Sequence, residues 1–296
     1  MEMLQVVTGI VFLMLLLSLL ATTIMELVAS VFSLRGSNLE KALRNLLAST
    51  DIDERILKAF KENALYKQLS FRYGSKREAP SYLTDESFQS ILFDVILKGE
   101  SIEKLQEKLD ELPDIDLKNV LKQLLNDADN HLDGFKAKVK DWYNNVMDRA
   151  SGWYKRSTQK ILIVVGMLIA VVFNADTIAI YGRLEKDPEA LQAILTAADA
   201  YVTDNDSIML RQSNPAFMQS YDELKTFVNE ELDAVKTPLG LGWYNVDISE
   251  FQWYDWLTKV LGWIVTALAI SLGAPFWFDL LRKLVNIRNA GKKPGE

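Results

Sequence analysis

Four polar side chains interrupt the apolar parts of this sequence and are its first candidates for chemistry. Glu26 is the sole charged residue between positions 3 and 34, and Asn174 and Asp176 belong to the motif NADT. Lys259 lies near the start of a third apolar run. A charged group in hydrocarbon is costly, so it normally faces protein or water, where it either serves an ion path or pairs with an opposite charge. The apolar runs contain few other polar residues that could line a path, and this favours structural pairing.

Two such pairs are predicted from position along the chain. Asp176 and Lys259 enter from the same end of their apolar runs, so a buried pair between them would compensate both charges. Glu26 lies near the other end of its run, where Arg282 or Lys283 could neutralise it. For Glu26 an ion or proton path remains the alternative.

These residues must be positioned by three apolar blocks, at 1–34, 161–182 and 256–279. Each matches the roughly 20 residues that an α-helix needs to cross about 30 Å of hydrocarbon. The first block lacks the basic start of a signal peptide, so we expect an uncleaved anchor. Pro275 is expected to kink or end the third block and to place Trp277 at the inner interface beside Arg282 and Lys283.

The charges between the blocks predict an orientation. Residues 35–160 carry a net charge of +1, residues 183–255 carry −9, and residues 279–296 carry +3. Because basic segments resist export, we expect the amino terminus outside, a cytoplasmic domain over 35–160, an external acidic loop over 183–255, and a cytoplasmic basic tail over 280–296.

The segments between the blocks have the periodicity of helices, so the predicted fold class is all-α, with a helical cytoplasmic domain and a smaller helical external (periplasmic) loop domain. Asn38 and Asp85 are the expected N-caps of two helices, and Asp187 is the expected cap of a third that starts at Pro188. We expect further helices at 53–67, 101–112, 116–127, 130 into the second block, and 220–237. The segment 71–84 is expected to be an irregular loop.

Aromatic residues gather before the third block and predict an aromatic belt at the outer headgroup layer. A carbohydrate-binding platform is the alternative interpretation of the same cluster. The residues are Trp243, Tyr244, Phe251, Trp253, Tyr254 and Trp256.

Composition excludes several kinds of site. The chain has no cysteine and one histidine, His131, so thiolate, iron–sulfur and histidine-rich metal sites are excluded. No nucleotide-binding, zinc-protease or hydrolase motif is present. Basic and acidic residues balance in 35–160, so nucleic-acid binding has no electrostatic basis. We expect no catalytic, cofactor-binding or metal-binding residues, and no enzymatic activity.

Four segments resemble an uncharacterised family of bacterial multi-pass proteins of the cytoplasmic (inner) membrane. They are LLSLLATTIMELVASVFSLRGSNLEKALRNLL at 15–47, APSYLTDESFQSILFDV at 79–95, DRASGWYKRSTQKILIVVGMLIAVVFNADTIAI at 148–180 and GAPFWFDLLRKLVNIRNAGKKP at 273–294. The resemblance implies an inner-membrane location. It brings no assigned activity.

The sequence therefore predicts a non-enzymatic membrane protein that acts as a scaffold, anchor or accessory subunit. Its expected partners are the lipid bilayer and either another protein or further copies of the chain. The alternatives are an oligomeric membrane-permeabilising or ion-conducting effector and an accessory subunit of a transporter.

Overall fold

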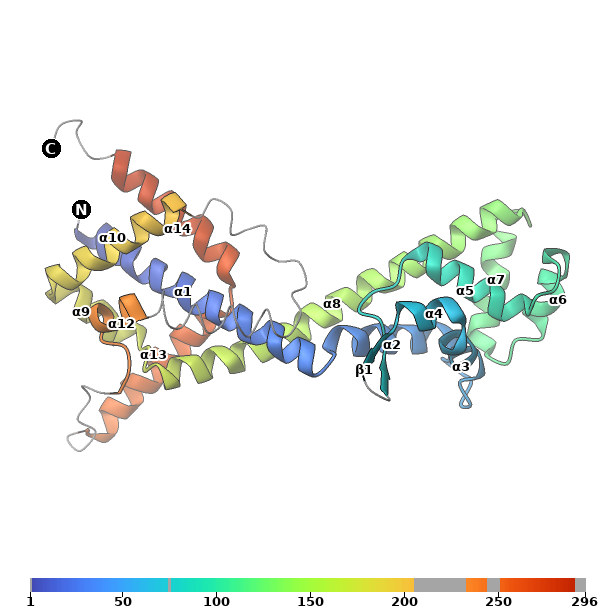
Figure 1. Ribbon diagram of the computed structural model, residues 1–296, viewed down its shortest axis with the longest axis horizontal. Coiled ribbons are helices and arrows are strands. Elements are labelled where there is room, and N and C mark those ends of the chain that lie inside the picture. The colour runs from blue at the N-terminus through green and yellow to red at the C-terminus, as the bar shows by residue number, and fades with distance from the viewer. Residues whose placement is uncertain (1, 74–75, 205–232, 244–250, 291–296) are drawn as a thin grey trace. The chain divides into compact units, whose positions relative to one another are not determined.

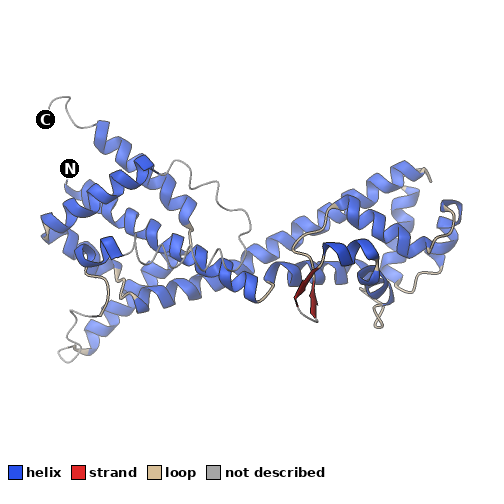
Figure 2. Cartoon of the chain, in the orientation of Figure 1, coloured by secondary structure: helices blue, strands red, loops and turns tan. Residues whose placement is uncertain are grey.

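The computed structural model describes residues 2–73, 76–204, 233–243 and 251–290 (Figure 1). Helices dominate this part of the chain, which confirms the predicted all-α class. A short antiparallel hairpin, β1 (Phe71–Tyr73) and β2 (Lys76–Glu78), is the exception, with Phe71 opposite Glu78 (Figure 2). The hairpin lies in the segment 71–84, which was predicted to be an irregular loop. Strands of three residues are too short to show an alternating pattern, so the sequence did not predict them.

The chain divides into two compact units, each with its own apolar core. Unit 1 comprises Met1–Val31 and Thr158–Glu296, and unit 2 comprises Phe32–Ser157. The long helix α8 (Leu132–Val172) begins in unit 2 and ends in unit 1. This helix confirms the prediction that a long helix continues into the second apolar block.

Unit 1 is built around its most apolar helix, α1 (Glu2–Val31). The other helices of this unit contact α1 or one another, and the residues Leu13–Leu17 of α1 are at most 1% exposed. A helix that is apolar all round is stable only when protein or lipid covers every face. Here protein covers much of it, since 67% of its most apolar window is buried. The helices, besides the end of α8, are α1 (Glu2–Val31), α9 (Thr177–Lys186), α10 (Pro188–Asp204), α12 (Asp233–Leu239), α13 (Trp253–Ile270) and α14 (Ala274–Ala290).

One helix of the described part, α1, is long and apolar enough to cross a membrane by itself. The second and third apolar blocks are broken: α8 and α9 meet at 49°, and α13 and α14 meet at 93°. The count rises to three if each bent pair forms one span. Of the three predicted spans, one is therefore a single helix and the other two correspond to bent pairs, so the count of three is not confirmed.

Unit 2 is a bundle whose centre is aromatic. The ring of Phe88 stacks on Tyr143 at 4.3 Å between centroids and touches Phe60 at 5.5 Å. All three side chains are at most 2% exposed. Besides the start of α8, the helices are α2 (Leu34–Leu47), α3 (Arg55–Glu62), α4 (Ala64–Leu69), α5 (Asp85–Leu97), the 3₁₀ turn η1 (Ile102–Lys104), α6 (Leu105–Asp110) and α7 (Ile115–Asn126).

Several helix starts differ from the sequence prediction. Asn38 is not an N-cap, because α2 begins earlier and the Asn38 amide donates to the carbonyl of Ala150 instead. Thr84, and not Asp85, caps α5 by accepting a hydrogen bond from the backbone N–H of Ser87. The predicted helix at 53–67 is two helices, because Asn63 ends α3 and caps α4.

The start predicted at Asp187 and Pro188 is confirmed: Pro188 opens α10 and the Asp187 carboxylate accepts from the N–H of Ala190 at 3.0 Å. The helix predicted at 220–237 lies outside the described residues except for α12. Tyr244 of the predicted aromatic belt is outside them as well.

Candidate functional site

The motif NADT forms a break between α8 and α9. Asn174 adopts a left-handed backbone conformation, with φ of 50°, and so turns the chain. Asparagine tolerates this conformation better than most residues. The amide of Asn174 then donates to the carbonyl of Gly242 at 3.0 Å, which attaches the segment before α13 to the break.

Hydrogen bonds from Gly242 and Trp243 pair with backbone carbonyl groups at the break, where the helical hydrogen bonds are interrupted. The indole N–H of Trp243 donates to the carbonyl of Val171 at 2.9 Å, and the N–H of Gly242 donates to the carbonyl of Phe173 at 2.7 Å. Inside a bilayer a non-helical segment is stable only when its polar groups find such partners. These hydrogen bonds would allow the break to lie where water is absent.

Asp176 is the N-cap of α9. Its Oδ1 accepts from the N–H groups of Ile178 at 3.0 Å and Ala179 at 3.3 Å, and the residue is 4% exposed. The carboxylate also lies directly against the backbone of Gly262 in α13, where a Cβ atom would overlap it. The close approach of α9 to α13 thus depends on a glycine opposite the cap.

Two threonines join the same helices. Thr266 of α13 donates to the carbonyl of Ala175 at 2.7 Å, and its hydroxyl lies 2.6 Å from that of Thr177. Gly166 of α8 lies close to the backbone of Ala267, the residue after Thr266. Small residues at this crossing let the two backbones approach closely.

Lys259 lies in the same site but does not form the predicted ion pair. Its Nζ lies 5.7, 5.8 and 5.9 Å from the ring centroids of Trp243, Phe251 and Trp263, and the residue is 8% exposed. Within the described residues, no carboxylate oxygen of Asp176 approaches this nitrogen within 4.0 Å. The reason is that the cap of α9 already uses that carboxylate, whereas aromatic faces can attract an ammonium group.

The structure therefore brings together three of the four predicted intramembrane polar residues, Asn174, Asp176 and Lys259. The fourth, Glu26, is half-buried in α1, and its pairing with Arg282 or Lys283 stays a prediction. Arg282 and Lys283 are exposed on α14. Trp277, expected at the inner interface, donates its indole N–H to the carbonyl of Ala269 at 2.7 Å and so closes the corner between α13 and α14.

Sequence analysis did not identify an ion pair at the other end of α14. Arg288, 5% exposed, pairs with Asp199 of α10. The pair joins two segments predicted to lie on opposite sides of the membrane, so that placement does not fit this contact. A signal was present, because Arg288 continues the apolar stripe of Leu281 and Val285 at helical spacing.

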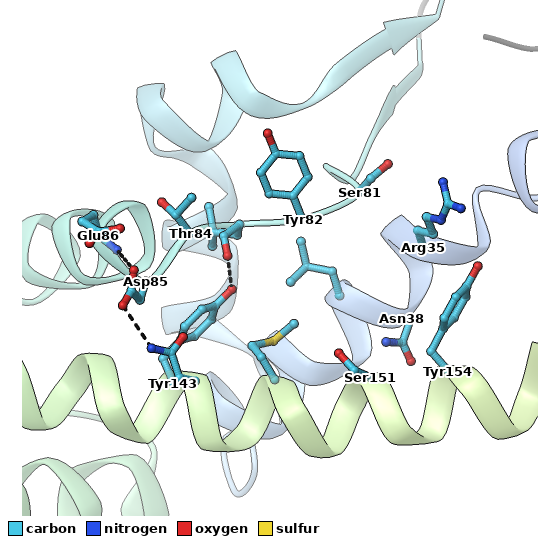
Figure 3. A pocket seen from close by; sticks show the side chains of 14 residues that line it. Arg35, Asn38, Ser81, Tyr82, Thr84, Asp85, Glu86, Tyr143, Ser151 and Tyr154 are labelled. Carbon is cyan, nitrogen blue, oxygen red and sulfur yellow. Dashed lines mark hydrogen bonds between the residues drawn. The ribbon is translucent and has the colours of Figure 1, made fainter. Parts of the chain in front are cut away.

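A second candidate site, also not identified from sequence, is a pocket of about 550 Å³ in unit 2 (Figure 3). Arg35 lies toward one end and Asp85 and Glu86 lie toward the other. Three segments distant in sequence form the pocket, at 35–39, 81–86 and 143–154. The lining residues are Arg35, Asn38, Leu39, Ser81, Tyr82, Leu83, Thr84, Asp85, Glu86, Tyr143, Asn144, Met147, Ser151 and Tyr154.

The acidic end of this pocket is held by hydrogen bonds. The amide of Asn144 donates to Asp85 at 3.0 Å, and the hydroxyl of Tyr143 donates to the carbonyl of Leu83 at 2.6 Å. Hydrogen bonding by Glu86 and then by Asn144 lowers the pKa of Asp85, and burial raises the pKa of Tyr143 above its ordinary value. Tyr143 is thus a neutral donor at physiological pH, and Asp85 is a carboxylate.

The lining can bind polar groups but lacks the parts of a nucleophilic centre. Among its residues no histidine, cysteine or lysine stands beside a serine or threonine to activate it. Hydroxyl and amide groups, one guanidinium and two carboxylates suit recognition of a polar surface.

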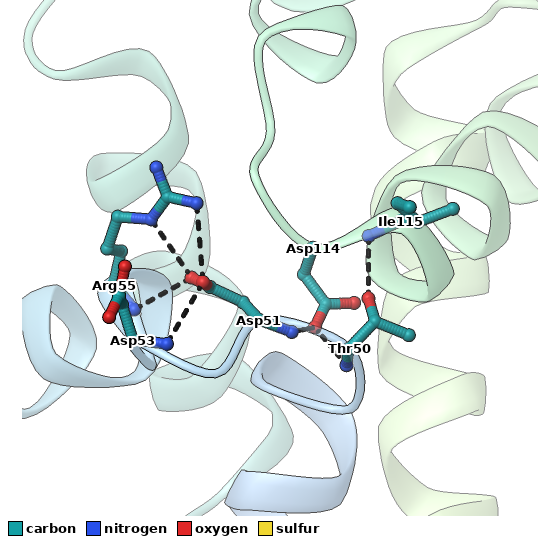
Figure 4. A network of polar contacts seen from close by, with 6 residues as sticks. All are labelled: Thr50, Asp51, Asp53, Arg55, Asp114 and Ile115. Carbon is teal, nitrogen blue, oxygen red and sulfur yellow. Dashed lines mark hydrogen bonds and ion pairs between the residues drawn. The ribbon is translucent and has the colours of Figure 1, made fainter.

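A network of aspartates joins the loop after α2 to the start of α7 (Figure 4). Asp114, fully buried, accepts from the N–H groups of Thr50 at 2.7 Å, Asp51 at 2.9 Å and Leu117 at 2.8 Å. Burial opposes ionisation of Asp114, but these backbone hydrogen bonds outweigh it and lower its pKa. The network is a structural clamp of unit 2.

The described residues contain no group of three or more histidine, cysteine, aspartate or glutamate side chains that could hold a metal ion. Comparisons of the chain with family models, with characterised proteins and with solved structures found no match.

Proposed function

We propose that this chain is a non-enzymatic, multi-pass integral membrane protein of a bacterial inner membrane, in which unit 1 is the anchor and unit 2 scaffolds a protein partner at the cytoplasmic face. The single observation that carries the proposal is the outer surface of α13 and of the end of α8. Residues there at helical spacing are large, apolar and 36% exposed or more. They are Val164, Leu168 and Val172 on α8, and Leu257, Val260, Leu261, Ile264, Val265 and Leu268 on α13.

These two stripes belong to helices that touch, since Gly166 of α8 lies against Ala267 of α13. Contiguous apolar patches of more than a few hundred Å² are rare on monomeric proteins in water. Lipid tails favour such a surface, and Trp253 and Trp256 at the start of α13 suit the headgroup layer. The membrane is the solvent that this flank of unit 1 fits best.

The proposed orientation comes from charge. Arg35 follows α1, and Lys155, Arg156 and Lys160 precede the apolar part of α8, so unit 2 is flanked by basic residues at both of its connections. Positive charge next to a span favours the cytoplasmic side. Unit 2 then lies inside, and the amino terminus and α10 lie outside.

Unit 2 is proposed to be the part that binds a partner. It folds around its own core and its pocket combines exposed Tyr82 with polar groups at both ends. Aromatic residues and arginine are the side chains that protein interfaces favour. Purification in a mild detergent followed by mass spectrometry should recover a stoichiometric partner whose binding is lost in Tyr82→Ala and retained in Ile52→Ala, which changes a fully exposed apolar residue outside the pocket.

The membrane location is tested by charge on the lipid-facing stripes. The double variant Leu168→Asp/Leu268→Asp should move the chain from the carbonate-resistant membrane pellet toward the supernatant, because a carboxylate in hydrocarbon is strongly disfavoured. Thr196→Asp, on the exposed face of α10, is the matched control and should stay in the pellet. Native chain recovered from the aqueous fraction without detergent would contradict the proposal.

A second function, an oligomeric ion-conducting effector, is favoured by one different observation. The helices α10 and α14 cover α1 but carry polar residues outward, including Gln192 and Thr196 on α10 and Asp279 and Lys283 on α14. A polar flank opposite a lipid-facing flank could line water between several copies. Conductance in liposomes with purified chain would favour this function, and its absence would favour the scaffold.

A further inference from the structure

The helix α14 turns back along α1 and does not continue the direction of α13. The chain leaves α13 at Ile270 and passes through a turn in which Gly273 has φ of 88°. It then begins α14 at Ala274, and the two helices meet at 93°. The hydroxyl of Ser18, midway along α1, donates to the carbonyl of Ile270 at 3.2 Å and so fixes where the turn lies.

One face of α14 belongs to the core around α1. Ala274, Phe278, Leu281 and Val285 recur at spacings of three and four, and each is at most 6% exposed. They share this core with Val6, Val11 and Leu13–Leu17 of α1. This face of α14 thus packs against α1. The opposite face carries exposed Asp279, Lys283 and Asn286, together with exposed Phe276 and Ile287.

The far end of α14 meets α10. Arg288 is 5% exposed and forms an ion pair with Asp199. Near the start of α1, Gly9 contacts Leu184 of α9 and Ile194 of α10. The start of α1, the helix α10 and the end of α14 therefore lie together in unit 1.

These contacts conflict with a third span that delivers its basic tail to the opposite side. An ion pair brings its atoms within a few ångströms, whereas the hydrocarbon layer is about 30 Å thick. Asp199 and Arg288 cannot lie on opposite sides of that layer while they are paired. Arg288 is also a poor orientation signal, because an opposite charge already neutralises it.

We propose that α13 and α14 form a re-entrant hairpin, so that the end of α14 lies on the same side of the membrane as α10 and the start of α1, and that the Asp199–Arg288 pair latches α14 there. The assignment of sides rests on the proposed membrane location; the latch itself does not. The charged and polar side chains on the outer face of α14, Asp279, Lys283 and Asn286, then require water or a protein partner beside them instead of lipid.

The side of α14 can be tested in the full chain, because it has no native cysteine. Three single-cysteine variants at exposed positions serve as reporters: Asn286→Cys on α14, Ala200→Cys on α10 and Asp133→Cys in unit 2. A membrane-impermeant maleimide is applied to spheroplasts and to inverted vesicles, with detergent-permeabilised samples as the measure of full labelling.

The hairpin predicts that Asn286→Cys and Ala200→Cys are labelled from the same side, and that Asp133→Cys is labelled from the other. Labelling of Asn286→Cys together with Asp133→Cys would overturn it. Carbonate extraction of each variant separates the two proposals. A chain that stays in the pellet with α14 on the side of unit 2 contradicts the hairpin alone, whereas a chain that leaves the pellet contradicts the membrane location.

The latch is tested by the reactivity of a buried reporter. Phe278→Cys, on the inner face of α14, should react at least tenfold faster with a small maleimide when Arg288→Ala is added. Lys283→Ala, on the exposed face of the same helix, is the matched control and should leave the rate unchanged. The combination Asp199→Arg/Arg288→Asp should restore the slow rate. An equal rate with and without Arg288→Ala would refute the latch. If the Arg288→Ala variant fails to fold, the labelling of Asn286→Cys still decides on which side of the membrane α14 ends.

Discussion

The two units both have apolar cores, but they expose different kinds of side chain on their surfaces. Unit 2 buries Phe60, Phe88 and Tyr143 and presents ion pairs at its surface, such as Lys61–Glu40 and Lys140–Glu86. Unit 1 also buries apolar residues around α1, but its α13 presents Leu261, Val265 and Leu268 outward and turns Lys259 and Thr266 inward.

This difference agrees with the proposed membrane location of unit 1. A surface of ion pairs is typical of a protein in water, whereas an apolar outer face with inward polar groups is typical of one in lipid. The polar residues of unit 1 act mainly on backbone groups at helix ends and breaks. Unit 2 uses the same chemistry in the Asp114 clamp, so the units differ in their surfaces more than in their internal hydrogen bonding.

The largest expected effect is on the helix crossing of unit 1. Gly262→Ala places a methyl group against the Asp176 carboxylate and should lower the stability of unit 1 by about 2 kcal/mol, as overpacking does. Thermal unfolding in detergent measures it. Gly182→Ala is the matched control, since nothing lies within 4 Å of its Cβ position, and it should be neutral or slightly stabilising. Equal melting of both variants would show that α9 and α13 do not approach closely.

A comparable change in unit 2 is expected from Asp114→Ala, which leaves three backbone N–H groups of the clamp without their acceptor. The loss should be about 2 kcal/mol, as for buried donors left unsatisfied. Hydrogen exchange should show faster opening of α7 and of residues 49–55 while α13 is unchanged. Gln123→Ala, at an exposed residue of the same helix away from the clamp, is the control.

The same carboxylate makes unit 2 sensitive to acid. Its pKa in the folded protein is below the ordinary value of 3.8, so its contribution is complete above pH 3.8 and is lost as the pH falls through the folded value. Exchange of α7 should therefore quicken below pH 3.8 in the native chain. Asp114→Asn has no charge to lose and should show less of this dependence; identical pH profiles would mean that other carboxylates cause it.

A smaller effect distinguishes a helix cap from a charge pair at Asp176. Asp176→Ala should destabilise unit 1 by about 1 kcal/mol, and Asp176→Asn should restore most of this, because asparagine caps helices as well as aspartate does. If the asparagine variant melts like the alanine variant, the negative charge itself is required, and an interaction with Lys259 becomes the better explanation.

The smallest effect is expected at Lys259. A buried charge is often replaced by an apolar residue of similar size without loss, so Lys259→Met should change the melting temperature little. This result would support an aromatic site that accommodates an ammonium group without depending on it. A loss as large as that of Gly262→Ala would instead give the ammonium a structural role and weaken the comparison between the units.

Much of the secondary structure could be predicted locally. The long α8 and the start of α10 at Pro188 follow from apolar periodicity and cap residues within a few residues. The break at NADT was not predicted, because the block 161–182 was expected to form one span. The predicted cap of α5, Asp85, is one residue too late. Thr84 and Asp85 are adjacent, and threonine and aspartate are both common N-cap residues, so the sequence does not distinguish them. The hairpin at 71–78 was too short to leave a pattern.

The site was predicted in part. Asn174, Asp176 and Lys259 stood out because polar residues are rare in apolar blocks, and the structure places all three at one helix break. Their actual partners are a glycine backbone, helix N–H groups and aromatic faces. The two glycines, Gly242 at Asn174 and Gly262 at Asp176, come from segments about 70 to 90 residues away in sequence, and spacing along the chain does not encode such contacts. The N–H groups capped by Asp176 and the rings around Lys259 are much nearer in sequence.

The sequence by itself determined the helical content, the position of the apolar blocks and the absence of a cysteine or histidine-rich site, because these depend on composition and on short-range periodicity. The tertiary structure alone decided that α14 returns along α1 to meet Asp199, and that three distant segments line one pocket in unit 2. The physical reason is that a turn of the chain is set by which surfaces bury each other best, and the pairing of distant surfaces has no local signature.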